Sequence, residues 1–254
     1  DGGDAVSMKT KIITLLKEAG TYVSGQQLCE QFGVSRTAVW KAIRQLRKEG
    51  YVIEAVTGKG YLFTEQAEVY SKSGIASLMQ TKWAGRQLYF HGSIGSTNVE
   101  AKRLAENGAP HGTLVVADMQ TDGRGRRGRQ WISPAGANIY FTLLLRPEFA
   151  PDKASMLTLV IAHAITRTFR DRLGLDARIK WPNDVVIGDR KTCGILTEMS
   201  VEQADIRYVV IGVGINVRKQ EFAPEIADRA IALDEVASLA EQVDRSALVA
   251  EIMK

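Results

Sequence analysis

Cysteine and histidine are scarce in this sequence, and long apolar runs are absent. Its 254 residues include two cysteines and three histidines. Cys29 and Cys193 lie far apart without a C-x-x-C spacing, so we predict neither a disulfide framework nor a structural zinc site. No apolar run approaches the ~20 residues that cross a bilayer, and the first residues lack a signal-peptide pattern. We therefore expect a cytoplasmic protein with no membrane partner.

The composition is that of an ordinary globular protein. Hydrophobic residues make up 45% of the chain and charged residues 24%, which argues against a disordered or coiled-coil protein. A chain of 254 residues can form one large domain or two unequal ones. Residues 8–66 carry nine Lys and Arg against five Asp and Glu, so the positive charge is concentrated there. We expect a basic domain over 8–66 and a second domain over 67–254.

The first of these domains has the spacing of a helix-turn-helix. Apolar residues recur at helical spacing over 8–19. A second helix opens with Ser24 and Gln27, which form a capping-box pattern, and a third extends from Ser35 to Gly50. The segment YVIEAVTGKGYLF then alternates and contains two glycines, as two strands of a wing would. The pattern predicts a winged helix-turn-helix.

The third helix is basic on its polar side. A basic helix face is often only solvated, but the helix-turn-helix spacing favours DNA binding. Hydroxyl and cationic side chains of the kind that reach bases and phosphates occupy its first turn and its polar face. A further lysine lies at the expected tip of the wing. The candidate DNA-binding residues are Ser35, Arg36, Thr37, Lys41, Arg44 and Lys59.

The second domain mixes strands and helices. The strand-like runs are LYFH, TLVVADM, NIYFTLLL, ARIKW and YVVIGVGINV. Helical patterns cover about 96–107 and 153–173. We predict a sheet with helices packed on one side, in a mixed α/β or α+β domain.

One connection between two of these strands, GRGRRGRQW at 123–131, is rich in arginine and glycine. Glycines let a backbone approach a ligand closely, and arginine side chains suit carboxylate and phosphate oxygens. A tail that binds nucleic acid is expected to be longer and more flexible, whereas this loop is flanked by tight apolar strands. The context favours a small anionic ligand.

Three other short stretches are weak signals when each is taken alone. KWPND, 180–184, ends a strand with a lysine and a carboxylate on either side of a proline. RKTCGIL follows it, and GVGIN ends a later strand with an asparagine. A lone lysine is usually a solvated charge, and glycines in a strand are usually packing contacts. Together with the STN of 96–98, however, these stretches form a specific set.

In order and spacing, STN, Q-x-x-GRGRRGR-x-W, KWPND, K-x-x-GIL and G-x-GIN resemble the bifunctional biotin protein ligases that also repress the biotin operon, the biotin–[acetyl-CoA-carboxylase] ligase family. The resemblance covers residues 8 to about 250. It implies an α+β chain, with a winged helix in front of a catalytic domain related to class II aminoacyl-tRNA synthetases and biotin and lipoate ligases. It also implies biotin, ATP and Mg²⁺, a biotin carboxyl carrier protein of acetyl-CoA carboxylase, operator DNA and a ligand-promoted homodimer.

The resemblance also assigns site residues. The catalytic residues it implies are Arg124, Arg126 and Lys191. The biotin-binding residues it implies are Ser96, Thr97, Asn98, Gln120, Arg124, Gly125, Arg126, Lys191 and Gly194. The nucleotide-binding residues it implies are Arg126, Arg129, Trp131, Lys180, Asn183, Asp184 and Asn216, of which Asn183 and Asp184 are the candidates for Mg²⁺.

Members of the family usually continue into a small SH3-like barrel, which we expect to be missing here because the sequence ends at LVAEIMK. Two other functions remain open. A lipoate or octanoate transferase shares the catalytic fold, although the arginine loop and the front domain argue against it. A repressor that senses a ligand without useful catalysis is the second, and the intact Lys191 and arginine loop argue against that one.

Overall fold

The computed structural model describes residues 7–64, 69–237 and 243–254. The chain divides into two compact units, Asp1–Met79 and Gln80–Lys254. The boundary expected from the sequence lies between residues 66 and 67. The units divide later because helix α4 (Lys72–Leu78) packs against α1 (Met8–Ala19) of the first unit. In the part of the chain that is described, no helix is both long and apolar enough to cross a membrane.

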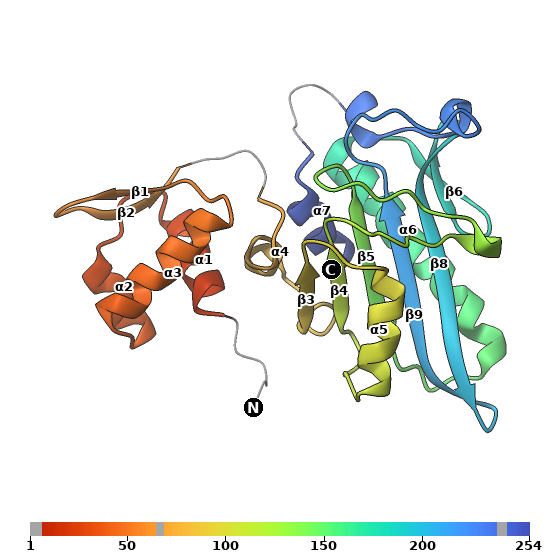
Figure 1. Ribbon diagram of the computed structural model, residues 1–254, viewed down its shortest axis with the longest axis horizontal. Coiled ribbons are helices and arrows are strands. Elements are labelled where there is room, and N and C mark those ends of the chain that lie inside the picture. Colours follow the sequence, from red (N-terminus) through yellow and green to blue (C-terminus); the bar gives the residue numbers. More distant parts are fainter. Residues whose placement is uncertain (1–6, 65–68, 238–242) are drawn as a thin grey trace. The chain divides into compact units, whose positions relative to one another are not determined.

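The first unit is a helix-turn-helix followed by a two-stranded hairpin (Figure 1). Ser24 and Gln27 form the expected capping box, and Gly33 ends the second helix in the left-handed conformation. The apolar faces of the three helices meet in a closed core that includes Ile12, Leu28 and Ile43. After α1, the elements are α2 (Gly25–Phe32), α3 (Arg36–Lys48), β1 (Ile53–Val56) and β2 (Gly60–Phe63).

The hairpin is fixed to the helices at Gly60. This glycine has φ +108°, and a Cβ on it would lie 2.2 Å from the carbonyl oxygen of Val23. Val23 and Tyr61 exchange backbone hydrogen bonds of 2.8 and 2.9 Å. No other residue fits at position 60, so the second glycine of TGKG sets the attachment of the wing.

The second unit is built on a seven-stranded mixed sheet with the order β3-β4-β5-β9-β8-β7-β6. β3 and β4 pair in parallel, and the other neighbours are antiparallel. β7 and β8 were not among the strands expected from the sequence. The strands are β3 (Leu88–His91), β4 (Leu114–Ala117), β5 (Ile139–Leu145), β6 (Ala177–Lys180), β7 (Asp184–Ile187), β8 (Arg190–Glu202) and β9 (Asp205–Ile215).

Helices cover both faces of this sheet, so the expectation that they pack on one side is wrong. Asn98 of α5 (Thr97–Glu106) bonds to Glu198, whereas Thr158 of α6 (Ala154–Leu173) bonds to Thr197. Neighbouring residues of a strand point to opposite faces. α5 and α6 therefore lie on opposite faces of the sheet, as Figure 1 shows. The expected α+β class is confirmed.

The last helix, α7 (Arg245–Ile252), packs on α6 and ties two loops of the unit together. Arg245 is buried, and its Nη1 lies 2.8 Å from Oδ1 of Asp118 and 3.2 Å from the carbonyl oxygen of Asn138. Asp118 follows β4 directly and also accepts the backbone N–H of Gly136. The ion pair thus connects the C-terminal helix to the loop that carries Gln120.

Candidate active site

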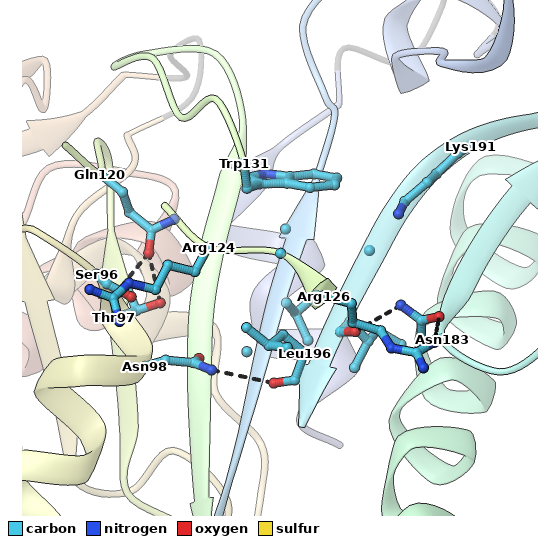
Figure 2. Close-up of a pocket in the computed structure, with 16 residues that line it drawn as sticks. Ser96, Thr97, Asn98, Gln120, Arg124, Arg126, Trp131, Asn183, Lys191 and Leu196 are labelled. Atoms are coloured by element: carbon cyan, nitrogen blue, oxygen red, sulfur yellow. Dashed lines mark hydrogen bonds between the residues drawn. The ribbon is translucent and has the colours of Figure 1, made fainter. Parts of the chain in front are cut away.

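A cleft opens on the face of the sheet that α5 covers. Figure 2 shows side chains from α5, from the arginine loop and from β8 converging on it. The empty space inside it, including the part open to solvent, is about 460 Å³. Its lining residues are Ser96, Thr97, Asn98, Gln120, Arg124, Gly125, Arg126, Trp131, Asn183, Lys191, Gly194, Ile195, Leu196, Gly212, Val213 and Gly214.

One wall of the cleft is a buried polar cluster at the start of α5. Ser96 is the N-cap residue of this helix, yet its hydroxyl makes no capping hydrogen bond. The backbone N–H and the hydroxyl of Thr97 both donate to Oε1 of Gln120, at 2.9 and 3.1 Å (Figure 2). Gln120 in turn donates its Nε2 to the hydroxyl of Ser133, at 3.0 Å. The polar atoms of this wall therefore have defined directions.

Glycines of β8 and β9 form the floor of the cleft. A Cβ on Gly212 would lie 2.1 Å from Oδ1 of Asn98, and one on Gly214 would lie 2.5 Å from Nε1 of Trp131. Gly194 pairs with Gly214 across the two strands, and a Cβ on Gly194 would lie 2.8 Å from the same indole ring. The missing side chains are thus what lets the side chains of Asn98 and Trp131 approach the sheet closely.

Two arginines of the loop face the cleft and are held by neighbouring oxygens. Arg124 pairs with Asp122 at 2.7 Å, and this hydrogen bond holds the pKa of Arg124 above its ordinary value. Nη1 of Arg126 lies 2.6 Å from Oδ1 of Asn183. The loop reverses at Arg127, which has φ +58°. Both guanidinium groups are exposed and stay cationic, so the loop presents positive charge to whatever enters the cleft.

A third cation lies across the cleft on β8. The ammonium of Lys191 lies 2.8 Å from Oδ1 of Asp184 and 5.3 Å from the centre of the Trp131 ring. The indole N–H of Trp131 is buried and has no hydrogen-bond partner among the described residues. A cation above an indole is favourable, but the buried donor without a partner is costly.

Eleven of the fifteen candidate residues for biotin and nucleotide binding line this cleft, and four do not. Asp184 reaches it only through Lys191. Asn216 is buried and joined to Thr192 through backbone hydrogen bonding. Arg129 and Lys180 are exposed outside it. In residues 7–64, 69–237 and 243–254, no group of three or more His, Cys, Asp and Glu side chains is placed to hold a metal ion.

The comparisons with known proteins agree with this architecture. The model of the biotin/lipoate A/B protein ligase family matches residues 90–216, and that of an HTH domain matches residues 9–62. The bifunctional ligase/repressor BirA of Bacillus subtilis is 42% identical over 250 residues, covering 97% of this chain and 76% of the relative. The chain belongs to the biotin/lipoate A/B protein ligase family.

Other members of this ligase family extend the likeness. BirA of Escherichia coli is 36% identical over 247 residues, covering 96% of this chain and 74% of the relative. The biotin protein ligase of Aquifex aeolicus, solved in complex with biotin and ATP, has a TM-score of 0.56 and 34% identity. The match covers 66% of this chain and 67% of that chain.

The front unit of this family member presents the expected basic residues on its surface. Arg36, Lys41, Arg44 and Lys59 are exposed. The hydroxyl of Ser35 accepts the N–H of Ala38 as the cap of α3. The Arg44 guanidinium lies 5.4 Å from the ring centre of Trp40, which is 52% exposed. Thr37 is also exposed in the first turn of α3.

Several residues of the site in this ligase were not expected from the sequence. Ile195, Leu196, Gly212, Val213 and Gly214 line the cleft, although GVGIN and GIL had been noted as motifs. Thr142 and Glu198 were missed as well, because nothing in their local sequence marks them. The hydroxyl of Thr142 lies 2.7 Å from Oδ1 of Asn98 and 2.8 Å from Oγ1 of Thr97.

Proposed function

We propose that the chain is an ATP-dependent biotin protein ligase that is also a biotin-responsive transcriptional repressor. The carboxylate of biotin attacks the α-phosphate of ATP, which gives biotinyl-5′-AMP and pyrophosphate. A lysine amine of a biotin carboxyl carrier protein, a subunit of acetyl-CoA carboxylase, then attacks the mixed anhydride and releases AMP. The observation that carries this proposal is the cleft itself, which brings a hydrogen-bonded polar wall and three cations together.

The first step brings two anions together. At ~4 Å their repulsion is about 1 kcal/mol in water and several times larger near protein. Arg124, Arg126 and Lys191 all line the cleft, so they can offset this charge as it shifts onto the phosphate in the transition state. We assign them the catalytic role. The ammonium of Lys191 is paired with Asp184 at 2.8 Å. This pair has to open before the ammonium can contact the incoming anions.

The ureido ring of biotin needs both donors and acceptors. Ser96, Thr97, Asn98 and Gln120 supply hydroxyl and amide groups on the polar wall. The uncommitted cap hydroxyl of Ser96 supports its place in this set. Gly125 and Gly194 let the ligand approach the backbone. In this structure the ring of Trp131 lies against Gly194.

The nucleotide is assigned to the other end of the cleft. Arg126, Trp131 and Asn183 line the cleft and support this part of the assignment. The full set of proposed nucleotide-binding residues is Arg126, Arg129, Trp131, Lys180, Asn183, Asp184 and Asn216.

Mg²⁺ is proposed to arrive with the phosphates of ATP. The chemistry fits, because Mg²⁺ in nucleotide sites needs only one or two protein oxygens, and Asn183 and Asp184 offer an amide and a carboxylate. Bound there, the ion would neutralise phosphate charge. Asn183 and Asp184 contact Arg126 and Lys191 in this structure, so those contacts have to open.

One experiment separates this proposal from its rivals. The protein is incubated with ATP labelled on its α-phosphate, a biotin carboxyl carrier domain and, in parallel reactions, biotin, lipoate or octanoate. We expect labelled biotinyl-AMP, then biotinylated carrier. Product from lipoate or octanoate but not from biotin would identify a transferase of the other branch. Tight biotin binding without adenylate would identify a ligand-sensing repressor.

The repressor half of the proposal rests on the front unit. Its HTH-domain match and its exposed cations support operator binding by Ser35, Arg36, Thr37, Lys41, Arg44 and Lys59. We further propose that biotinyl-AMP promotes a homodimer, which presents two recognition helices to a two-fold operator in the cytoplasm. Sedimentation and footprinting with and without the adenylate test this coupling. Equal oligomeric state and equal affinity in both conditions would refute it.

A further inference from the structure

Asn98 is the residue of the polar wall whose orientation is most completely determined. Its Nδ2 donates to the carboxylate Oε2 of Glu198 at 2.8 Å and to the carbonyl oxygen of Leu196 at 3.3 Å. Its Oδ1 accepts from the hydroxyl of Thr142 at 2.7 Å. If the amide turned over, its oxygen would face the carboxylate and the carbonyl, which are both acceptors. The carboxylate of Glu198, together with the carbonyl of Leu196, therefore decides which way this amide points.

Glu198 is itself held in place by the same helix. Lys102, one helical turn after Asn98 on α5, lies 2.6 Å from Oε1 of Glu198. Burial acts to raise the pKa of Glu198, but the hydrogen bonds from Lys102 and Asn98 outweigh it and leave the pKa below its ordinary value. The carboxylate is therefore charged at neutral pH. It is shared between two residues of α5 that project toward β8.

The orientation passes on from Asn98 to the rest of the wall. The Thr142 hydroxyl is shared between Asn98 and Thr97, and the Thr97 hydroxyl donates to Gln120. Gln120 donates to Ser133, which donates to the carbonyl oxygen of Trp131 at 2.9 Å. A continuous series of hydrogen bonds thus leads from one carboxylate along the wall.

We infer that Glu198 is a positioning residue of the cleft: by orienting Asn98 it fixes the donors and acceptors that the cyclic urea of the ligand meets. Glu198 does not line the cleft and acts through Asn98. This inference rests on the proposed function, because the ligand is the one proposed there. Buried polar networks with every member bonded specify a single arrangement, which is the property a polar ligand site requires.

The test uses Glu198→Gln in the full chain, with Glu100→Gln as the matched control. Glu100 lies on α5, and its carboxylate pairs with Arg103 at 2.7 Å, outside the wall. In Glu198→Gln we expect biotin affinity to fall about tenfold or more, because the charged acceptor of the Asn98 amide is replaced by a neutral amide that can also donate. The rate of adenylation at saturating biotin should change less than about threefold, since the cations of the cleft are intact. The control should match the parent in both.

A double-mutant cycle shows whether Glu198 acts through Asn98. If it does, adding Glu198→Gln to an Asn98→Ala protein should weaken biotin binding no further. Additive losses in the cycle, or parental biotin affinity in Glu198→Gln, would overturn the inference.

A readout without ligand separates this inference from the proposed function. In the ligand-free protein, the side-chain amide protons of Asn98 should exchange slowly by NMR, and faster in Glu198→Gln than in Glu100→Gln. A parent that binds no biotin but shows this difference would sink the proposed function and keep Glu198 as the residue that orients Asn98. Unchanged amide exchange in Glu198→Gln would overturn the orienting role itself.

Discussion

Gly212→Ala is the sharpest single test of how the cleft is built. Gly212 lies in the middle of β9, in register with Thr142 of β5 and Leu196 of β8. The added Cβ would lie 2.1 Å from Oδ1 of Asn98, 2.8 Å from its Cγ and 3.0 Å from its Nδ2. Asn98 is buried and bonded on both ends of its amide. It therefore has to leave its hydrogen bonds to make room for one methyl group.

Two effects set how much unfolding free energy Gly212→Ala loses. Inserting a methyl group into a tightly packed core costs ~1–3 kcal/mol. Losing a hydrogen bond to a charged group, here the one from Asn98 to Glu198, costs ~1.5–3 kcal/mol. Because relaxation relieves part of each, we expect a total of about 3 kcal/mol of unfolding free energy. For a unit of this size that lowers Tm by about 6–12 °C, at ~2–4 °C for each kcal/mol.

Thermal unfolding and calorimetric titration with biotin measure the two consequences. The matched control is Gly92→Ala, where an added Cβ would meet nothing within 4 Å. We expect the control to unfold and bind as the parent does, and Gly212→Ala to lose both stability and biotin affinity. If Gly212→Ala keeps the parental Tm to within about 1 °C and the parental affinity, the reasoning that places Asn98 on the glycine floor is refuted.

Three other predictions follow from the site and the surface. Arg126→Ala and Lys191→Ala should each slow pyrophosphate release by ~10²–10³ with native circular dichroism, because each removes a cation from the reacting centre; rates within a few-fold of the parent would contradict this role. Operator affinity falls as salt rises, and Lys41→Ala should make the slope of log affinity against log salt less negative by about 1. An unchanged slope in filter binding would show that this lysine does not contact the DNA. Cys193 is fully buried, and burial raises the pKa of its thiol. When the native protein is treated with iodoacetamide at pH 8, a peptide map should therefore show Cys193 unmodified. Its rapid modification there would contradict the buried position.

The sequence predicted best where local patterns decide the structure. Ser24 and Gln27 form the capping box that their spacing indicated, and the helix-turn-helix follows from such local patterns. The resemblance brought Thr97, Gln120 and Lys191 into one set, and the structure places all three on one cleft. Their proposed roles remain predictions until ligand binding is measured.

What the sequence could not supply are contacts between distant strands and helices. Glu198 lies 100 residues from Asn98 in the chain, and a glutamate in a strand carries no local signal of a long-range partner. β8 was missed as a strand because RKTCGIL was interpreted as a motif. Asn98 of α5 and Thr158 of α6 bond to neighbouring residues of β8. Without this strand, the position of the two helices on opposite faces of the sheet could not be inferred. Gly212 was seen only as part of a motif, since what fills the space above a glycine depends on the folded sheet.

The ion pair of Arg245 bears on how this protein can be shortened. The family model ends at residue 216, whereas Arg245 holds Asp118 across 127 positions of the chain. A fragment trimmed to the matched region would keep every residue that lines the cleft and lose the helix that anchors the loop before Gln120. The region that the family model matches is thus smaller than the region that packs together. Fragments meant for ligand screening should retain α7, and comparing 80–254 with 80–216 by proteolysis would measure what that helix contributes.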